Sequence, residues 1–277
     1  MNEKSIISLL GCGWLGFPLA TCLISRGYDV KTSTTSTEKL DILTGAGIDS
    51  YLVQFSGGAP APDLKKILDA GTLIITIPPG RKAPGGFDSY RQMIQTVCKQ
   101  VPASAISRIV FISSTSVYPD TNTTLDEDAD IAPATESGKL MAETEALLAL
   151  LPVKVIILRL AGLIGPQRMP GKFFSGKTKI PNGLAPVNLI HRDDVIGVVQ
   201  RLIENEDASG IYNACAPSHP TRNEFYTLAA QKEDLTLPDF TLEKNHWKIV
   251  ASKRVEKELG FKFEFPSLMQ FLRNYQG

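Results

Sequence analysis

Three glycines near the start of the chain constrain its fold more than any other feature. In LLGCGWLGFPLA, Gly11, Gly13 and Gly16 follow an apolar segment and open a stretch of helical periodicity. At this spacing the first glycine permits a tight turn, the second lets a diphosphate approach the backbone, and the third lets a helix pack closely on a strand. Backbone N–H groups and the helix dipole then favour a phosphate anion. The segment therefore predicts a strand–loop–helix unit that binds a dinucleotide, the alternative being a glycine-rich turn without a ligand.

Two residues inside this loop are expected to contact the same ligand. Trp14 and Leu15 lie between the second and third glycines, where the backbone passes the diphosphate. An alternative for Trp14 is a place in the core or the wall of the pocket, as is usual for a large aromatic side chain.

Short apolar segments alternate with helix-length segments through the first 160 residues. Segments rich in Ile, Val and Leu predict strands at 5–10, 29–35, 50–55, 72–77, 108–113 and 153–160. Amphipathic stretches predict helices around 15–26, 63–70, 87–101 and 137–150. Strands that are apolar on both faces suit the buried strands of a parallel sheet. The alternation predicts an α/β fold of the Rossmann type, with a doubly wound parallel sheet.

The pattern changes after Leu160. Residues 162–186 are rich in Gly, Pro and Lys and predict a loop. A helix is expected over 193–205 and a strand over 210–215, and further helices over 221–232, 252–260 and 267–275. We therefore expect an NAD(P)-binding Rossmann domain over 1–165, to which 187–215 return. Residues 166–186 and 216–277 would form a small C-terminal substrate-binding lobe.

Charge and cysteine usage exclude several classes of partner. Lys and Arg number 29 and Asp and Glu number 29, so no global field favours nucleic acid or a membrane. The four cysteines are scattered and form no CxxC pair, and the histidines do not cluster. This pattern indicates neither a disulfide framework nor a metal site, and it fits a cytoplasmic protein with reduced thiols.

The segment VKTSTTSTEKL at the end of the second predicted strand bears on the choice of dinucleotide. An NAD site usually offers a carboxylate to the ribose hydroxyls there, and a carboxylate would repel a 2′-phosphate. No acidic residue lies between Lys31 and Thr37, and Lys31 or Lys39 can add positive charge. The hydroxyl groups that can donate hydrogen bonds belong to Ser33, Thr34, Thr35 and Ser36. The segment favours NADP over NAD; alternatively, these hydroxyls only end a strand and cap a helix at Thr37.

Several motifs occur in one order along nearly the whole chain: GCGWLG, FISSTSVYPD, GKLMAE, LRLAGLIGP, LIHRDDV, GIYNACAP and KELGF. In that order they resemble the extended short-chain dehydrogenase/reductases, the NAD(P)-dependent epimerase/dehydratase family, and especially its atypical bacterial members grouped with nucleoside-diphosphate-sugar epimerases. The resemblance implies redox-linked chemistry on a small hydroxyl- or carbonyl-bearing molecule, such as a nucleotide sugar. It also implies a monomer or a homodimer, the latter paired through the helices at 87–101 and 137–150.

The resemblance implies catalytic roles for Ser114 and Lys139. In the family, the residue matching Ser114 polarises a substrate hydroxyl or carbonyl. The lysine holds the nicotinamide ribose and lowers the pKa of a tyrosine four residues earlier, but that position here is Thr135. A phenol titrates near a pKa of about 10 and an aliphatic hydroxyl much higher, so threonine cannot replace tyrosine as an acid or base. The usual proton relay is therefore missing.

Three hypotheses follow from this loss. In the first hypothesis, Tyr118 of SVYPD replaces the missing tyrosine as proton donor; the alternative for Tyr118 is that it packs against the substrate lobe. In the second hypothesis, the chain binds NADP(H) without turnover, as a sensor or regulatory protein. In the third, hydride transfer proceeds while Ser114, a water or the substrate handles the proton. Lys139 contacts the cofactor in all three.

The remaining candidates come from other loops. By analogy with the family, Pro78 and Pro79 after the fourth strand and Ser113 at the end of the fifth are expected to line the cofactor. Arg81 and Lys82 either reach a phosphate or are solvated loop charges.

The loop GPQRMPGKFFSGKTKIP carries several basic residues with few acids beside them. Arg168 and Lys172 would grip an anionic substrate; alternatively, this is a solvated loop over Phe173 and Phe174.

Overall fold

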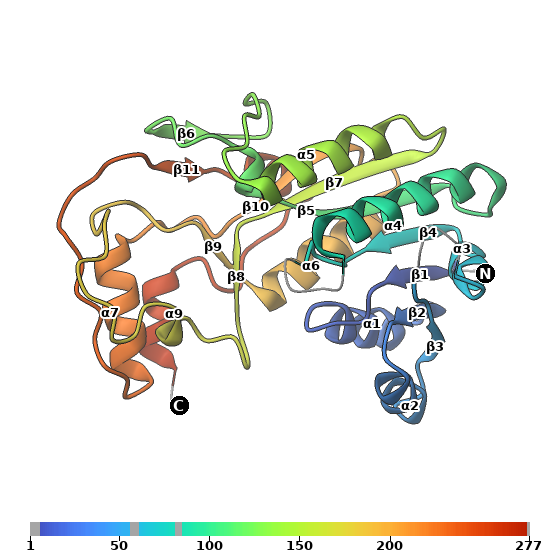
Figure 1. Cartoon of the computed structure of the whole chain (residues 1–277), viewed down its shortest axis with the longest axis horizontal. Coiled ribbons are helices and arrows are strands. Elements are labelled where there is room, and N and C mark those ends of the chain that lie inside the picture. The colour runs from blue at the N-terminus through green and yellow to red at the C-terminus, as the bar shows by residue number, and fades with distance from the viewer. Residues whose placement is uncertain (1–5, 56–60, 81–84, 276–277) are drawn as a thin grey trace. The chain divides into compact units, whose positions relative to one another are not determined.

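The computed structural model describes residues 6–55, 61–80 and 85–275 (Figure 1). These fall into two units. The first comprises the described residues of Met1–Ser114, Pro133–Leu158 and Asp207–Ile211, and the second comprises those of Thr115–Ala132, Arg159–Glu206 and Tyr212–Gly277. The grouping differs from the boundaries expected from the sequence, because 115–132, 159–165, 187–206 and 212–215 group with the second unit.

A parallel sheet forms the centre of the first unit, and residues 159–160 and 212–214 at the ends of two of its strands group with the second unit. Among the described residues its seven strands lie in the order β10-β7-β5-β4-β1-β2-β3. The strands are β1 Ile7–Leu10, β2 Val30–Thr34, β3 Asp49–Leu52, β4 Thr72–Ile75, β5 Arg108–Ser114, β7 Lys154–Leu160 and β10 Gly210–Ala214. β1 pairs in parallel with β2 on one side and β4 on the other, so that Ile7 lies opposite both Val30 and Thr72. The Rossmann fold expected from the sequence is confirmed.

Helices connect these strands. They are α1 Gly16–Ser25, α2 Thr37–Gly45, α3 Leu64–Leu68, α4 Gly86–Gln100 and α5 Glu136–Ala149, with the 3₁₀ turn η1 Val101–Ala103 after α4. In the sheet, β2 and β3 lie on one side of β1, and β4 and β5 lie on the other side. Right-handed crossovers therefore place α1 and α2 on one face of the sheet and α3, α4 and α5 on the other. Figure 1 shows α4 and α5 side by side, as their contacts confirm.

Burial on both faces explains the continuous apolar strands. All four residues of β1 and of β4 are buried. Each fully buried Leu or Ile contributes about 1.5–3 kcal/mol through the hydrophobic effect. Ser8 is the polar exception in β1, since it is fully buried and its hydroxyl has no hydrogen-bond partner among the described residues.

The second unit is built from shorter elements. These are η2 Thr115–Val117, β6 Thr123–Leu125, β8 Gly162–Ile164, η3 Pro170–Phe173, β9 Leu189–His191, α6 Arg192–Glu204, α7 Arg222–Lys232, β11 Lys248–Val250, α8 Lys253–Lys257 and α9 Leu268–Asn274. β6 pairs in parallel with β11, and β8 with β9. The segment expected to be a loop at 162–186 thus contains β8 and η3. A core cluster that includes Phe225, Leu268 and Leu272 lies under α7 and α9.

Within the described ranges, no helix combines the length and the apolar character needed to cross a membrane.

Candidate functional site

Gly11 and Gly16 are required by the packing of the loop that links β1 to α1. Gly11 has φ 109°, and a Cβ there would lie 2.6 Å from Ile77 Cγ1. A Cβ on Gly16 would lie 2.2 Å from the carbonyl oxygen of Gly11. No real Cβ tolerates such distances, so both positions must be glycine for the helix to start directly against the strand.

Gly13 differs from its two neighbours. It is exposed, its φ lies outside the left-handed region, and a Cβ there would meet nothing within 4 Å. The chain's own packing would accept a side chain at this position. The packing of the described residues therefore does not require a glycine at this position.

The first two amides of the loop are bound by β2. The Gly11 N–H donates to Ser33 Oγ at 2.9 Å, and the Cys12 N–H donates to the Ser33 carbonyl at 2.8 Å. On the other side, Thr76 Oγ1 donates to the Gly11 carbonyl at 2.5 Å. In this arrangement the Ser33 hydroxyl, which the sequence led us to expect at the ribose, holds the loop itself.

The start of α1 presents the positive end of its dipole without compensation. Its first turn contains no acidic residue, and its N-cap, the buried Leu15, makes no side-chain capping bond. The Phe17 N–H donates to the Gly13 carbonyl, and Pro18 has no N–H. Trp14 is half-buried beside them. A helix start of this kind attracts an anion.

Cys12 turns its side chain into the protein. It packs with Leu43 and Ile48, and burial raises the pKa of its thiol. The thiol is therefore a structural apolar group rather than a nucleophile.

The hydroxyl groups at the end of β2 have separate local partners. Thr34 Oγ1 accepts the Ser36 N–H at 3.2 Å, and Ser36 Oγ accepts the Lys39 N–H at 3.2 Å. Ser36 thus caps α2, which begins at Thr37. Thr35 is exposed, and its carbonyl accepts Gln54 Nε2 at 2.8 Å.

The two lysines considered for a 2′-phosphate lie differently. Lys31 Nζ donates to the Asp69 carbonyl at 2.7 Å and pairs with its carboxylate at 3.1 Å. Lys39, in the first turn of α2, is half-buried, and its charge acts on the Cys12 thiol of the glycine loop. Of the two lysines, Lys39 is the one whose charge lowers the pKa of the Cys12 thiol.

The loops after β4 and β5 lie at the same edge of the sheet as the glycine loop, because all three follow carboxyl ends of parallel strands. Pro78 is exposed and Pro79 half-buried directly after β4. Ser113 is buried, and its hydroxyl donates to Glu145 Oε1 of α5 at 2.5 Å. Ser114, the last residue of β5, is half-buried and points to the opposite face of the strand. Arg81 and Lys82 lie outside the described residues.

Thr135 has a structural role at the start of α5. It is the N-cap residue, and its Oγ1 accepts the Gly138 N–H at 3.1 Å. Lys139 is exposed and pairs with Glu136 at 2.9 Å, which lowers the pKa of that carboxyl. The position that the family gives to tyrosine thus lies at the boundary of the helix, where a short capping hydroxyl is favoured.

Tyr118 belongs to a buried polar network of the second unit. The residue is 1% exposed. Its hydroxyl donates to Asn213 Oδ1 at 2.9 Å and accepts Arg159 Nη1 at 2.8 Å. Burial raises the pKa of the phenol, and the Arg159 charge offsets part of that effect. The guanidinium also lies 4.9 Å from the ring centroid.

This network extends to Glu127, which sequence reasoning missed. Glu127 is buried and accepts the backbone amides of Asn213 and Arg254. The acidic run LDEDAD in the printed sequence does not show which of its carboxylates is buried, because the partners lie 86 and 127 residues away.

Arg168 and Lys172 both lie on an exposed part of the second unit. Their loop is fixed to α7, since the Gly171 N–H donates to Glu233 Oε1 at 2.6 Å. The two phenylalanines that follow are half-buried, and Phe174 lies edge-on to Tyr226 with ring centroids 4.6 Å apart. The packed phenylalanines agree with a solvated loop over aromatic residues. The exposed Arg168 and Lys172 agree with a site for an anionic substrate.

IHRDDV at the start of α6 also has a structural explanation. His191 is the N-cap, and its Nδ1 accepts the Asp193 N–H at 3.3 Å. Asp194 is 1% exposed and accepts the amides of Glu264 and Phe265 at 2.6 and 3.2 Å. Burial raises its pKa to about 6. Among the described residues, no group of three or more His, Cys, Asp or Glu side chains could hold a metal ion.

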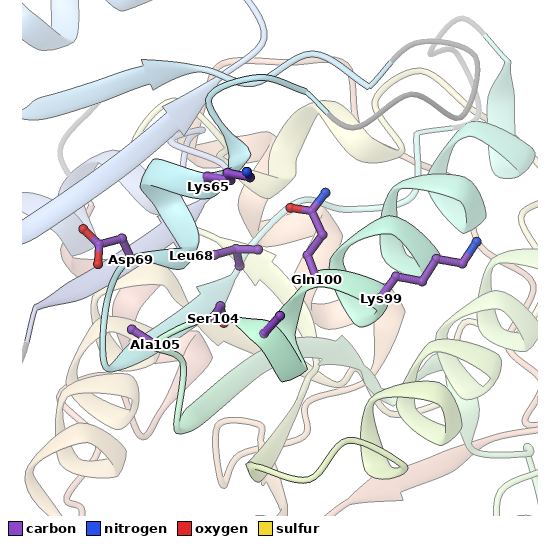
Figure 2. A pocket seen from close by; sticks show the side chains of 8 residues that line it. Lys65, Leu68, Asp69, Lys99, Gln100, Ser104 and Ala105 are labelled. Carbon is purple, nitrogen blue, oxygen red and sulfur yellow. The ribbon is translucent and has the colours of Figure 1, made fainter.

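A hollow of about 480 Å³ in the first unit lies at the other edge of the sheet. Its lining residues Asp69 and Ala105 shortly precede β4 and β5, whereas the glycine loop follows the carboxyl end of β1. Figure 2 shows Asp69 and Lys99 pointing in opposite directions, away from its middle. This hollow is separate from the glycine loop.

Comparison with known proteins gives a relative over nearly the whole chain. No protein-family model matches the chain. Protein YeeZ of Escherichia coli (strain K12) is 42% identical over 265 residues, which are 94% of this chain and 96% of YeeZ.

Solved structures share the fold at lower identity. The Bordetella bronchiseptica enzyme WbmG, in complex with NAD and UDP, has a TM-score of 0.78 at 17% identity and covers 99% of this chain and 96% of its own. A short-chain dehydrogenase/reductase superfamily protein from Agrobacterium tumefaciens with bound NAD has a TM-score of 0.78 at 16% identity, over 97% and 95% of the two chains. UDP-N-acetylglucosamine 4-epimerase from Bacillus cereus has a TM-score of 0.74 at 16% identity, over 98% and 100%.

Proposed function

The chain belongs to the family of Protein YeeZ and has the fold of the NAD-dependent epimerases and other extended short-chain dehydrogenase/reductases, and on that premise we propose that its glycine loop binds a nicotinamide dinucleotide. The function that fits best is redox-linked chemistry on a small hydroxyl- or carbonyl-bearing metabolite. The dinucleotide supplies the hydride acceptor or donor when bound.

The observation that carries this proposal is the open space at Gly13. Gly11 and Gly16 are explained by the chain's own packing, but Gly13 is exposed and would accept a Cβ without contact. A diphosphate that lies against the backbone would need that space. The amides from Gly13 to Gly16 would hold it, because those of Gly11 and Cys12 already donate to Ser33.

For the choice of dinucleotide, we favour NADP over NAD. No carboxylate lies between Lys31 and Thr37 to repel a 2′-phosphate. Lys31 is bound to Asp69, so the positive charge would come from Lys39, with hydrogen bonds from Thr35 and Ser36. Lys39→Ala should then weaken NADP⁺ binding by roughly 5- to 10-fold and leave NAD⁺ unchanged. Equal effects on both coenzymes would exclude this role.

The proton step would run without a phenol next to Lys139. Thr135 caps a helix, and Tyr118 is buried with both hydrogen-bonding roles of its hydroxyl in use. We therefore assign Tyr118 to packing and give Lys139 the nicotinamide ribose. A secondary alcohol oxidised at this site would pass its hydride to the coenzyme and its proton to a water, with Ser114 orienting the oxygen.

The same two observations favour a second candidate function, a sensor or regulatory protein that binds NADP(H) without turnover. Thr135 caps a helix, and Tyr118 is held in a buried network. Neither position therefore provides a phenol that could act as acid or base. In this alternative, Lys139 and the glycine loop keep their roles in binding the coenzyme.

A nucleotide sugar is the substrate class we propose. WbmG binds UDP together with NAD, and the Bacillus cereus protein is a UDP-sugar epimerase. Arg168 and Lys172, both exposed, would contact the anionic part of such a molecule. A cytoplasmic location and a monomeric or homodimeric state stay predictions from the sequence.

Two titrations test the proposal. Calorimetry with NADP⁺ and NAD⁺ should give heat of binding for at least one of them. Nicotinamide absorbance should then rise when UDP-sugars are added with the oxidised coenzyme, or fall when small carbonyl compounds are added with the reduced one. Binding without any change across a broad panel would favour the sensor, and the lack of heat with both coenzymes would overturn both functions.

A further inference from the structure

Hydroxyl groups from two strands hold the first residue of the glycine loop. β1 lies between β2 and β4 in the sheet (Figure 1). From β2, Ser33 Oγ accepts the Gly11 N–H at 2.9 Å. From the end of β4, Thr76 Oγ1 donates to the Gly11 carbonyl at 2.5 Å. Both polar groups of Gly11 are thus engaged by side chains.

Such support matters at Gly11 because of its backbone conformation. A glycine explores the widest range of backbone conformations, and Gly11 sits at φ 109°. Side-chain hydrogen bonds therefore fix the orientation of its peptide groups. Ser33 is 2% exposed, so water cannot easily replace its hydroxyl as the acceptor.

The orientation of Gly11 also sets the rest of the loop. Its carbonyl oxygen lies 2.2 Å from the position that a Cβ on Gly16 would take, so the first turn of α1 packs directly on it. A rotated Gly11 carbonyl would displace the helix start, and with it the amides from Gly13 to Gly16.

We propose that Ser33 and Thr76 are positioning residues that set the loop amides for the diphosphate of the dinucleotide, and that neither touches the ligand. The inference rests on the proposed dinucleotide binding. It gives Ser33 a role other than the ribose contact expected from the sequence. A direct contact at the ribose would discriminate between NAD and NADP, whereas a positioning role affects both coenzymes equally.

The test compares Ser33→Ala and Thr76→Val with matched controls. Ser8→Ala removes a similarly buried hydroxyl from the adjacent strand, and within the part of the chain that the structure describes that hydroxyl has no partner. Thr76→Ser keeps the donor that Thr76→Val removes. Calorimetry with NAD⁺, NADP⁺, ADP and AMP should show roughly 5- to 20-fold weaker binding of the diphosphate ligands to the first two variants. AMP should change much less, and both controls should bind as the wild type does.

Amide hydrogen exchange without ligand gives a second measurement. The Gly11 amide should exchange faster in Ser33→Ala, and the Cys12 amide, which donates to the Ser33 backbone, should stay protected. Wild-type binding by Ser33→Ala, or a loss confined to NADP⁺, would overturn the positioning role. If the wild type binds no dinucleotide, the proposed function fails. Unchanged exchange of the Gly11 amide in Ser33→Ala would separately refute the role of the Ser33 hydroxyl in holding Gly11.

Discussion

Replacing Tyr118 with Phe should destabilise the second unit and leave the chemistry of folded protein intact. The change removes one hydroxyl from a site that is 1% exposed. It removes the hydrogen bond to Asn213 Oδ1 and the bond from Arg159 Nη1. Each unsatisfied buried group costs about 1–3 kcal/mol, so the free energy of unfolding should fall by roughly 3 kcal/mol. For a cooperative unit of this size, that corresponds to a Tm lower by roughly 6–12 °C.

Thermal unfolding followed by circular dichroism measures this effect, and Tyr51→Phe is the control. The Tyr51 hydroxyl donates to the exposed Asp49 carboxylate at 3.1 Å, so its loss should change Tm by little. The reasoning is refuted if Tyr118→Phe is as stable as the wild type. A fully stable variant that loses turnover would restore the hypothesis that Tyr118 donates the proton.

Three further predictions concern structural groups. Thr135→Ala should lower stability by about 1 kcal/mol through loss of the α5 cap, whereas Thr135→Ser should match the wild type in chemical unfolding. Asp194 has a raised pKa of about 6, so the folded unit binds its proton more tightly than the unfolded chain. Stability should therefore fall by roughly 2 kcal/mol as pH rises from about 4 to 6, and urea titrations of Asp194→Asn should lack this contribution; an identical pH dependence in the variant would contradict it. Burial raises the pKa of Cys215 to about 12, so iodoacetamide should leave it unmodified in folded protein, as peptide mass spectrometry would show; rapid labelling there would show that the thiol is accessible.

The strands and helices of the first unit could be predicted from the sequence because their signals are local. Apolar runs predicted β1, β4 and β5 to within about two residues of the observed ends. The short strands β6 and β11 were missed, since each has three residues and its partner lies more than a hundred residues away. The sequence predicts two parts but not their boundaries, because the β6–β11 pairing ties 115–132 to the second unit.

The roles of individual polar residues depended on contacts that a sequence does not show. Ser33 was placed at the correct strand end, but its partner is an amide 22 residues earlier, whose direction follows from the φ of Gly11. Thr135 was recognised as a departure from the family pattern. Its capping role was readable in principle, since a threonine directly before a helix with Glu136 next to it is a common N-terminal signal. The burial of Tyr118 could not be predicted from the sequence and is seen only in the structure.

Calorimetric titration of NADP⁺ and NAD⁺ into Gly13→Glu, beside the wild type, tests the central claim most directly. A Cβ at this position meets nothing within 4 Å and the position is exposed, so the variant should fold with an unchanged Tm. Its carboxylate would lie against the diphosphate, and a repulsion on the order of 3 kcal/mol predicts affinity roughly 100-fold weaker. Equal binding by the variant and the wild type would show that the dinucleotide, if it binds at all, does not lie on this loop.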